Sequence, residues 1–101
     1  MMPEIEWITP EEIRKRLERG EALNLIDVRE PDEAAEGMIA GARHIPLGDL
    51  PERFKEIEKS GEIIFVCRSG NRSGRACEYM QSLGYSGLKN MTGCMLAYGK
   101  P

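Results

Sequence analysis

The sequence predicts an α/β fold built as a single domain. The chain has 101 residues, a length that suits one hydrophobic core. Patterns typical of helices and of strands alternate along it. The run "EIIFV" at 62–66 has the apolar, β-branched and aromatic composition of a central parallel strand that is covered on both faces. We therefore expect one domain over residues 1–101, with its core at about 5–99.

The first half of the chain is predicted to run strand, helix, strand, helix and extended segment. The segment "EIEWI" can form a short strand. Thr9 then has the features of a helix N-cap, with a proline in the first turn and Glu12 completing a capping box, and Gly20 should end that helix. The run "ALNLIDV" has a β pattern ending in Asp27, "PDEAAEG" can form a short helix, and "AGARHIP" can be extended.

The second half is predicted to contain two further strands and three helical segments. Apolar residues lie on one face of a helix over 49–61, and the strand at 62–66 follows it. A helical spacing then begins at Asn71 or Arg72 and continues to residue 83, where a glycine follows as a stop signal. Residues 87–91 form a short strand, and residues 92–100 a turn and a last helical segment.

Composition and charge exclude several functional classes. Net charge is −3, with −6 in residues 1–36 and +3 in residues 37–101, and the basic residues there are dispersed without interleaved aromatics, so a nucleic-acid partner is not expected. No apolar run approaches the ~20 residues that span a bilayer, and the acidic start "MMPEIEWITPEE" does not have the pattern of a signal peptide, so we expect a cytoplasmic protein without a membrane partner. The spacing of the three cysteines fits neither disulfides nor a zinc site, which predicts reduced thiols and no metal.

The segment "CRSGNRSGRA", from Cys67 to Ala76, concentrates the chemistry of the chain. It follows the buried strand, precedes a helix, and contains three arginines and no acid. In a strand, glycine turn and helix of this kind, backbone N–H groups converge above the helix N-terminus and bind an anion. A cysteine at the start of such a turn is stabilised as thiolate, so Cys67 is a candidate nucleophile that needs no help from His44, the only histidine.

Two other interpretations of this loop compete on the residues alone. It can be a structural turn with an inert, buried cysteine and solvated arginines, because free cysteine is often a small core residue. A nucleotide-phosphate loop fits less well, since GxxxxGK[ST] is absent and the loop contains no lysine. ATP chemistry is therefore not indicated.

Three segments together resemble the rhodanese family in its single-domain sulfurtransferase form. They are "LIDVREPDEAAEGMIAGARHIPL", "IIFVCRSGNRSGRA" and "NMTGCMLAY", in the order and spacing of that family. The resemblance implies a five-stranded parallel sheet flanked by helices on both faces. It also implies a catalytic cysteine that carries sulfane sulfur as a persulfide from a donor such as thiosulfate to a thiophilic acceptor such as cyanide or a thiol, with no cofactor.

The resemblance also assigns roles to individual residues. It makes Cys67 the persulfide-bearing nucleophile and gives Asp27 and Arg29, which match a "D-x-R" pattern, a structural role beneath the loop. The substrate-binding cradle that it implies comprises Arg68, Ser69, Gly70, Asn71, Arg72 and Ser73.

Three positions depart from the usual sequence pattern of the family. Met38 stands where histidine is frequent, and Tyr98 replaces a common tryptophan; both changes are conservative in packing. Cys94 falls where "TGG" usually has its second glycine. Because that turn borders the active-site loop in this fold, Cys94 is either a resolving thiol that attacks the persulfide or a small residue tolerated in a turn. Cys77, in the middle of a helix, is expected in the core.

Two alternatives to the sulfurtransferase stay open. Relatives of this fold use a cysteine cradle as phosphatases or arsenate reductases, but those loops are C-x5-R, whereas Cys67 to Arg72 is C-x4-R. A non-catalytic, rhodanese-like binding module is the other alternative, although such modules commonly lack the cysteine. We expect a monomer whose partners are a small anionic sulfur donor, a thiophilic acceptor and a possible sulfur-relay protein.

Overall fold

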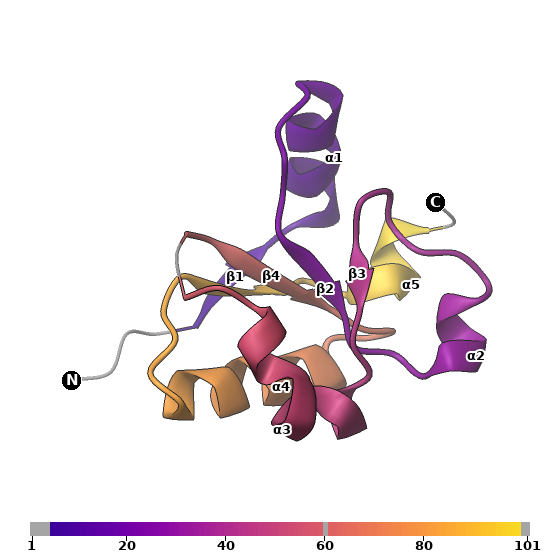
Figure 1. The fold of residues 1–101 in the computed structure, drawn as a ribbon. Helices are drawn as coiled ribbons and strands as arrows, with labels where there is room; N and C mark the ends of the chain where they lie inside the picture. The colour runs from indigo at the N-terminus through magenta and orange to yellow at the C-terminus, as the bar shows by residue number, and fades with distance from the viewer. Residues whose placement is uncertain (1–4, 60, 100–101) are drawn as a thin grey trace.

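The computed structural model describes residues 5–59 and 61–99 and contains a five-stranded sheet in which every neighbouring pair is parallel (Figure 1). The order of the strands across the sheet is β1-β5-β4-β2-β3. The α/β fold predicted from the sequence is therefore confirmed. The strands are β1 (Glu6–Ile8), β2 (Leu25–Asp27), β3 (Arg43–His44), β4 (Ile63–Val66) and β5 (Leu88–Met91). Glu4, expected in the first strand, and Lys100, expected in the last segment, lie outside the described residues.

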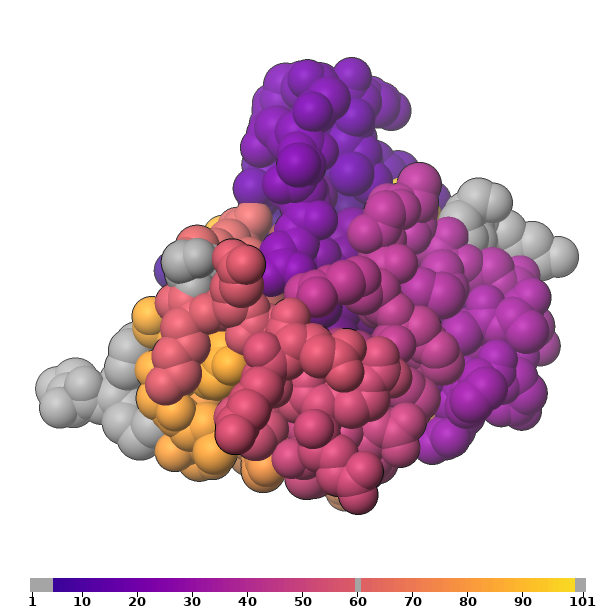
Figure 2. Space-filling view, in the orientation of Figure 1, coloured from indigo at the N-terminus to yellow at the C-terminus, as the bar shows by residue number. Residues whose placement is uncertain are grey.

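Helices cover both faces of the sheet. Figure 1 shows α3 and α4 below the sheet and α1 and α5 on its other side. Arg14 connects α1 to α5. Its guanidinium donates to the Tyr98 carbonyl and lies 4.2 Å from the centre of the Tyr98 ring. In the space-filling view α1 projects from the body of the molecule (Figure 2). The helices are α1 (Pro10–Glu18), α2 (Pro31–Ala34), α3 (Leu50–Arg53), α4 (Asn71–Ser82) and α5 (Cys94–Tyr98).

Strand β4 is the centre of the hydrophobic core. Its four residues are at most 1% exposed, as expected for a strand covered on both faces. It pairs with β2 on one side and β5 on the other. The segment that follows it therefore begins at the carboxyl end of the sheet, where parallel α/β folds place their binding sites.

Helix α1 begins with the Thr9 N-cap that the sequence predicts. The Thr9 side chain accepts a hydrogen bond of 3.1 Å from the Glu12 backbone N–H, which satisfies one of the free donors of the first turn. The helix ends at Glu18, and Gly20 follows with a φ of +82°, a left-handed conformation that favours glycine.

The prediction of a single helix over 49–61 is wrong. The chain instead forms the short 3₁₀ helix η1 (Leu47–Asp49), then α3, then the short 3₁₀ helix η2 (Phe54–Glu56), and becomes extended at Ile57. The carbonyls that would continue a helix have partners elsewhere, because the Tyr85 hydroxyl donates to the carbonyls of both Phe54 and Ile57. Burial of the Ile57 side chain, which is 1% exposed, turns the chain inward at that point.

Within the described residues, no helix combines the length and the apolar character needed to cross a lipid bilayer.

Candidate active site

The segment between β4 and α4 forms a tight loop at the carboxyl end of the central strand. Cys67 directly follows β4, and Gly70 is the N-cap of α4 with a φ of +109°. Residues other than glycine rarely adopt that backbone conformation, so Gly70 makes the turn possible. The loop therefore places the Cys67 side chain against the first turn of a 12-residue helix.

The sulfur of Cys67 lies among hydrogen-bond donors. The Gly70 N–H donates to Sγ at 3.0 Å, and the Ser73 Oγ lies 3.3 Å from it. The pKa of Cys67 is lowered to about 4, by the thiol of Cys94 first and then by the hydroxyl and N–H of Ser73 and the N–H of Gly70, although burial opposes the shift. The side chain is 0% exposed, so these contacts act in a site screened from water. These contacts favour the thiolate form of Cys67 at neutral pH.

Asn90 on β5 braces the loop from below. Its Nδ2 donates to the Gly70 carbonyl at 3.1 Å, and its Oδ1 accepts a hydrogen bond from Ser73 Oγ. The residue is only 3% exposed. Asn90 is not among the predicted site residues, although an amide within the predicted strand "GLKNM" was a usable signal. Asn90 thus fixes both the turn and the serine that faces the thiolate.

Cys94, the first residue of α5, lies directly beside Cys67. The Cys67 N–H donates to Cys94 Sγ at 3.2 Å, and the Ser73 Oγ lies 3.3 Å from the same sulfur. Cys94 is also buried, and its φ of +46° makes it the one non-glycine residue with positive φ in the described chain. Its pKa is raised, first by the hydrogen bond to Cys67 and then by burial. The contacts between the two cysteines therefore shift their pKa values in opposite directions, downward for Cys67 and upward for Cys94.

Helix α5 is held against the loop by backbone hydrogen bonds. The N–H of Met95 donates to the Cys67 carbonyl at 3.0 Å, and the N–H of Leu96 donates to the Arg68 carbonyl at 2.9 Å. The turn that carries Cys94 and the loop that carries Cys67 therefore form one unit.

The side chain of Arg72 binds Glu33 on α2 instead of the Cys67 sulfur. Both of its terminal nitrogens donate to the carboxylate of Glu33 on α2, at 2.6 and 2.8 Å. This pairing lowers the pKa of Glu33 to about 2 and raises that of Arg72. Glu33 was missed by the sequence analysis, because nothing in its own segment indicates a partner 39 residues away. The ion pair joins α2 to the start of α4.

Asp27 and Arg29 form a buried pair at the end of β2. The Arg29 Nη2 donates to an Asp27 carboxylate oxygen at 2.7 Å and also to the Gly37 carbonyl at 2.7 Å. A further guanidinium nitrogen donates to the Glu33 carbonyl. His44 lies behind this pair, with its Nε2 2.7 Å from the Arg29 carbonyl. The pair therefore holds the segment around α2, whose Glu33 binds Arg72 of the cysteine loop, and Asp27 itself lies opposite Val66, the residue before Cys67.

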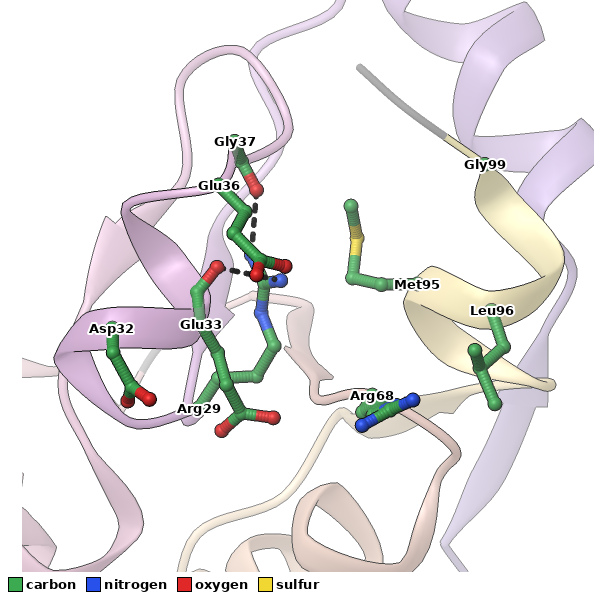
Figure 3. Close-up of a pocket in the computed structure, with 9 residues that line it drawn as sticks. All are labelled: Arg29, Asp32, Glu33, Glu36, Gly37, Arg68, Met95, Leu96 and Gly99. Carbon is green, nitrogen blue, oxygen red and sulfur yellow. Dashed lines mark hydrogen bonds between the residues drawn. The ribbon is translucent and has the colours of Figure 1, made fainter.

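A cavity of about 500 Å³ opens between α2 and α5 beside the loop (Figure 3). Acidic side chains gather on its α2 side, whereas Arg68 and α5 face them from the other side. Arg68, Ser69 and Asn71 are exposed. Among residues 5–59 and 61–99, no group of histidine, cysteine or acidic side chains is arranged to hold a metal ion. The cavity is lined on the α2 side by Arg29, Asp32, Glu33, Glu36 and Gly37, and opposite them by Arg68, Met95, Leu96 and Gly99.

The structure brings only some of the predicted site residues together at the Cys67 sulfur. Cys67, Gly70, Ser73 and Cys94 meet around one sulfur, whereas Arg68 and Arg72 extend from the loop toward the cavity and α2. Cys77 is buried in α4, and its sulfur lies 3.6 Å from the Lys89 carbonyl. Burial raises its pKa to about 12, so Cys77 is an inert core thiol.

Comparison with known proteins identifies the family of the chain. Residues 9–100 match the family described as Rhodanese-like domain. The chain is 43% identical to the Bacillus subtilis protein YtwF, whose name provisionally designates a sulfurtransferase, over 94% of this chain and 91% of YtwF. It is 34% identical to the human thiosulfate:glutathione sulfurtransferase, over 81% of this chain and 83% of that protein. The crystal structure of a rhodanese-like domain protein from Staphylococcus aureus superposes with a TM-score of 0.89 at 30% identity, covering 95% of this chain and 93% of that one. The chain therefore belongs to the family of rhodanese-like domains.

Proposed function

We propose that the protein is a sulfurtransferase that carries sulfane sulfur as a persulfide on Cys67. The observation that carries the proposal is the hydrogen bond from the Gly70 N–H to the Cys67 sulfur, at the N-terminus of α4. That position stabilises negative charge on whichever sulfur occupies it. The membership of the chain in a family with relatives named as sulfurtransferases supports the same conclusion.

The first half of the reaction loads the cysteine. The Cys67 thiolate attacks the terminal sulfur of thiosulfate, a new S–S bond forms, and the S–S bond of the donor breaks. Sulfite leaves with the electron pair of that bond, and the negative charge of the enzyme moves to the outer sulfur of the persulfide. No proton is transferred in this step, so no histidine base is needed.

The second half regenerates the thiolate. An acceptor with a nucleophilic carbon or sulfur, such as cyanide or a thiolate, attacks the outer persulfide sulfur. The Cys67 sulfur leaves as thiolate, and its low pKa makes it a good leaving group. With cyanide the product is thiocyanate, and with a thiol, including one on a sulfur-relay protein, it is a new persulfide.

Burial and charge at the loop support a small, anionic donor. Because the Cys67 side chain is 0% exposed, a terminal and unhindered sulfur reaches it more easily than one inside a bulky disulfide. Arg68, the next residue, lines the cavity and offers a cation to the sulfonate end of thiosulfate. The name of the human relative points to the same donor.

The arrangement of Arg72 disfavours the phosphatase alternative. A phosphoryl group needs a forked arginine that faces it, but both terminal nitrogens of Arg72 already bind Glu33. The C-x4-R spacing from Cys67 to Arg72 is also one residue shorter than the C-x5-R loop of cysteine phosphatases. The non-catalytic binding module is also disfavoured, because binding alone does not require contacts that lower the pKa of Cys67.

The proposal is tested by the release of thiocyanate from thiosulfate in excess cyanide. We expect wild type, Cys94→Gly and the matched control Cys77→Ala to turn over, because all three keep the Cys67 thiolate. Cys67→Ser should be inactive, because a hydroxyl at that position is not ionised. Absence of thiocyanate with both wild type and Cys94→Gly, or activity that survives in Cys67→Ser, would refute the proposal.

A further inference from the structure

We propose that Cys94 is a second reactive thiol, which discharges the Cys67 persulfide by forming a Cys67–Cys94 disulfide and releasing hydrosulfide. This activity would convert sulfane sulfur to sulfide within the chain itself, besides transferring it to an external acceptor. It rests on the proposed function, because without a persulfide on Cys67 there is nothing to discharge.

The two sulfurs share one small buried site. Each lies 3.3 Å from the Ser73 Oγ, and the Cys94 sulfur is 3.2 Å from the backbone nitrogen of Cys67 itself. Backbone hydrogen bonds from the N–H groups of Met95 and Leu96 fasten the α5 turn to the cysteine loop. Proximity of this kind makes an intramolecular thiol far more effective than a free one.

The backbone position of Cys94 is unusual for a side chain of any kind. Its φ of +46° lies in the left-handed region, which glycine adopts freely and other residues rarely adopt. The preceding Gly93, with a φ of +66°, completes a turn that glycine alone would form with less strain. The chain thus places the Cys94 thiol beside Cys67, at a position whose left-handed backbone conformation favours glycine over any residue with a side chain.

The charge on Cys67 controls the reactivity of its neighbour. The Cys94 thiol reaches two acceptors, the Met91 carbonyl at 3.1 Å and the Cys67 sulfur, and an ionised sulfur is the stronger acceptor. In the resting protein the Cys67 thiolate therefore keeps the proton on Cys94. Once Cys67 carries a persulfide, its own sulfur is neutral and the charge lies on the outer sulfur. Loading thus removes the group that held Cys94 protonated.

The discharge balances without an added oxidant. The Cys94 sulfur attacks Cys67 Sγ, a bond forms between these two atoms, and the bond from Cys67 Sγ to the outer sulfur breaks. The outer sulfur leaves with the electron pair and takes the Cys94 proton as hydrosulfide. One sulfane sulfur is reduced and two cysteines are oxidised to a disulfide. An external thiol then restores both cysteines by thiol–disulfide exchange.

The test follows the mass of the intact protein after a short anaerobic exposure to thiosulfate, followed by removal of the reagent and an acid quench at successive times. Wild type is compared with Cys94→Gly and with Cys94→Ser. Glycine suits the left-handed backbone, so that variant should fold, and serine retains a hydrogen-bond donor but no nucleophile. Cys77→Ala is the control for loss of a buried thiol outside the site. Anaerobic samples without thiosulfate show any disulfide that forms by another route.

Wild type and Cys77→Ala should pass from one sulfur heavier to two hydrogens lighter than the starting protein. They should release one hydrosulfide per chain and yield a peptide that links Cys67 to Cys94. Both Cys94 variants should remain one sulfur heavier, with a persulfide that lasts at least about tenfold longer. Equal persulfide lifetimes in wild type and the Cys94 variants would overturn the inference and leave the proposed function intact. No gain of sulfur by Cys94→Gly would instead count against the proposed function.

Discussion

Replacing Cys94 by glycine should raise the pKa of Cys67, because the Cys94 thiol is the largest of the groups that lower it. Cys67 is fully buried, so the loss is not damped by solvent. A hydrogen bond to a charged group is worth roughly 1.5–3 kcal/mol, and each pKa unit corresponds to about 1.36 kcal/mol. From the wild-type value of about 4, the pKa should therefore rise by roughly one to two units.

The assay is the ultraviolet absorbance of the thiolate, taken as the difference between each chain and its Cys67→Ser counterpart across a pH series. This signal needs no reagent to reach the buried sulfur. Because the folded pKa is depressed, the absorbance should be complete at neutral pH and fall as the pH drops through the folded value. Cys94→Ser, which keeps a donor, should lie between wild type and Cys94→Gly. Identical midpoints in wild type and Cys94→Gly, or a wild-type midpoint near the ordinary value of 9.0, would refute this reasoning.

Three further substitutions test the supports of the site by urea unfolding. Asp27→Ala leaves the buried Arg29 guanidinium without its carboxylate and should cost about 3–5 kcal/mol; a loss below about 1 kcal/mol would show that the pair is not a support. Asn90→Leu removes the hydrogen-bond partner of the Gly70 carbonyl and the acceptor of the Ser73 hydroxyl, so it should cost about 1–3 kcal/mol and slow thiocyanate release. Unchanged turnover would mean that the brace does not position the loop. Gly93→Ala should cost at least about 1 kcal/mol, because its new Cβ would lie 2.7 Å from another Cβ at a φ of +66°; an unchanged midpoint would contradict the geometry of the α5 turn.

The features that sequence reasoning could predict are those written within one short segment. The burial of the strand at 62–66, the glycine turn after it and the helix from Asn71 follow from apolar content, glycine placement and helical spacing in adjacent residues. The Thr9 cap is equally local, since its partner is three residues away. For the same reason Cys67 was recognisable as the nucleophile candidate from its loop alone.

The features that could not be predicted from the sequence depend on contacts between distant segments. The pairing of Glu33 with Arg72 joins residues 39 apart, and each of them alone is an ordinary surface charge. The helix expected over 49–61 fails because the Tyr85 hydroxyl, 31 residues beyond Phe54, takes carbonyls that a helix would use. Local propensity is weak against such tertiary contacts.

Cys94 shows the same limit from another side. Its position in the sequence leaves both a resolving thiol and a tolerated turn residue open, whereas the structure shows which atoms surround it. A positive φ at a non-glycine residue cannot be read from the sequence without the turn that imposes it.

The most direct test of sulfur transport by Cys67 is the mass of the Cys94→Gly chain after incubation with thiosulfate and removal of the excess. This chain keeps the proposed carrier and lacks the neighbouring thiol that we expect to discharge it. We predict a gain of one sulfur atom, mapped by peptide analysis to Cys67 and removed by cyanide with release of one thiocyanate per chain. A mass that does not change, or a sulfur that maps to Cys77, would contradict the proposal that Cys67 carries the sulfur.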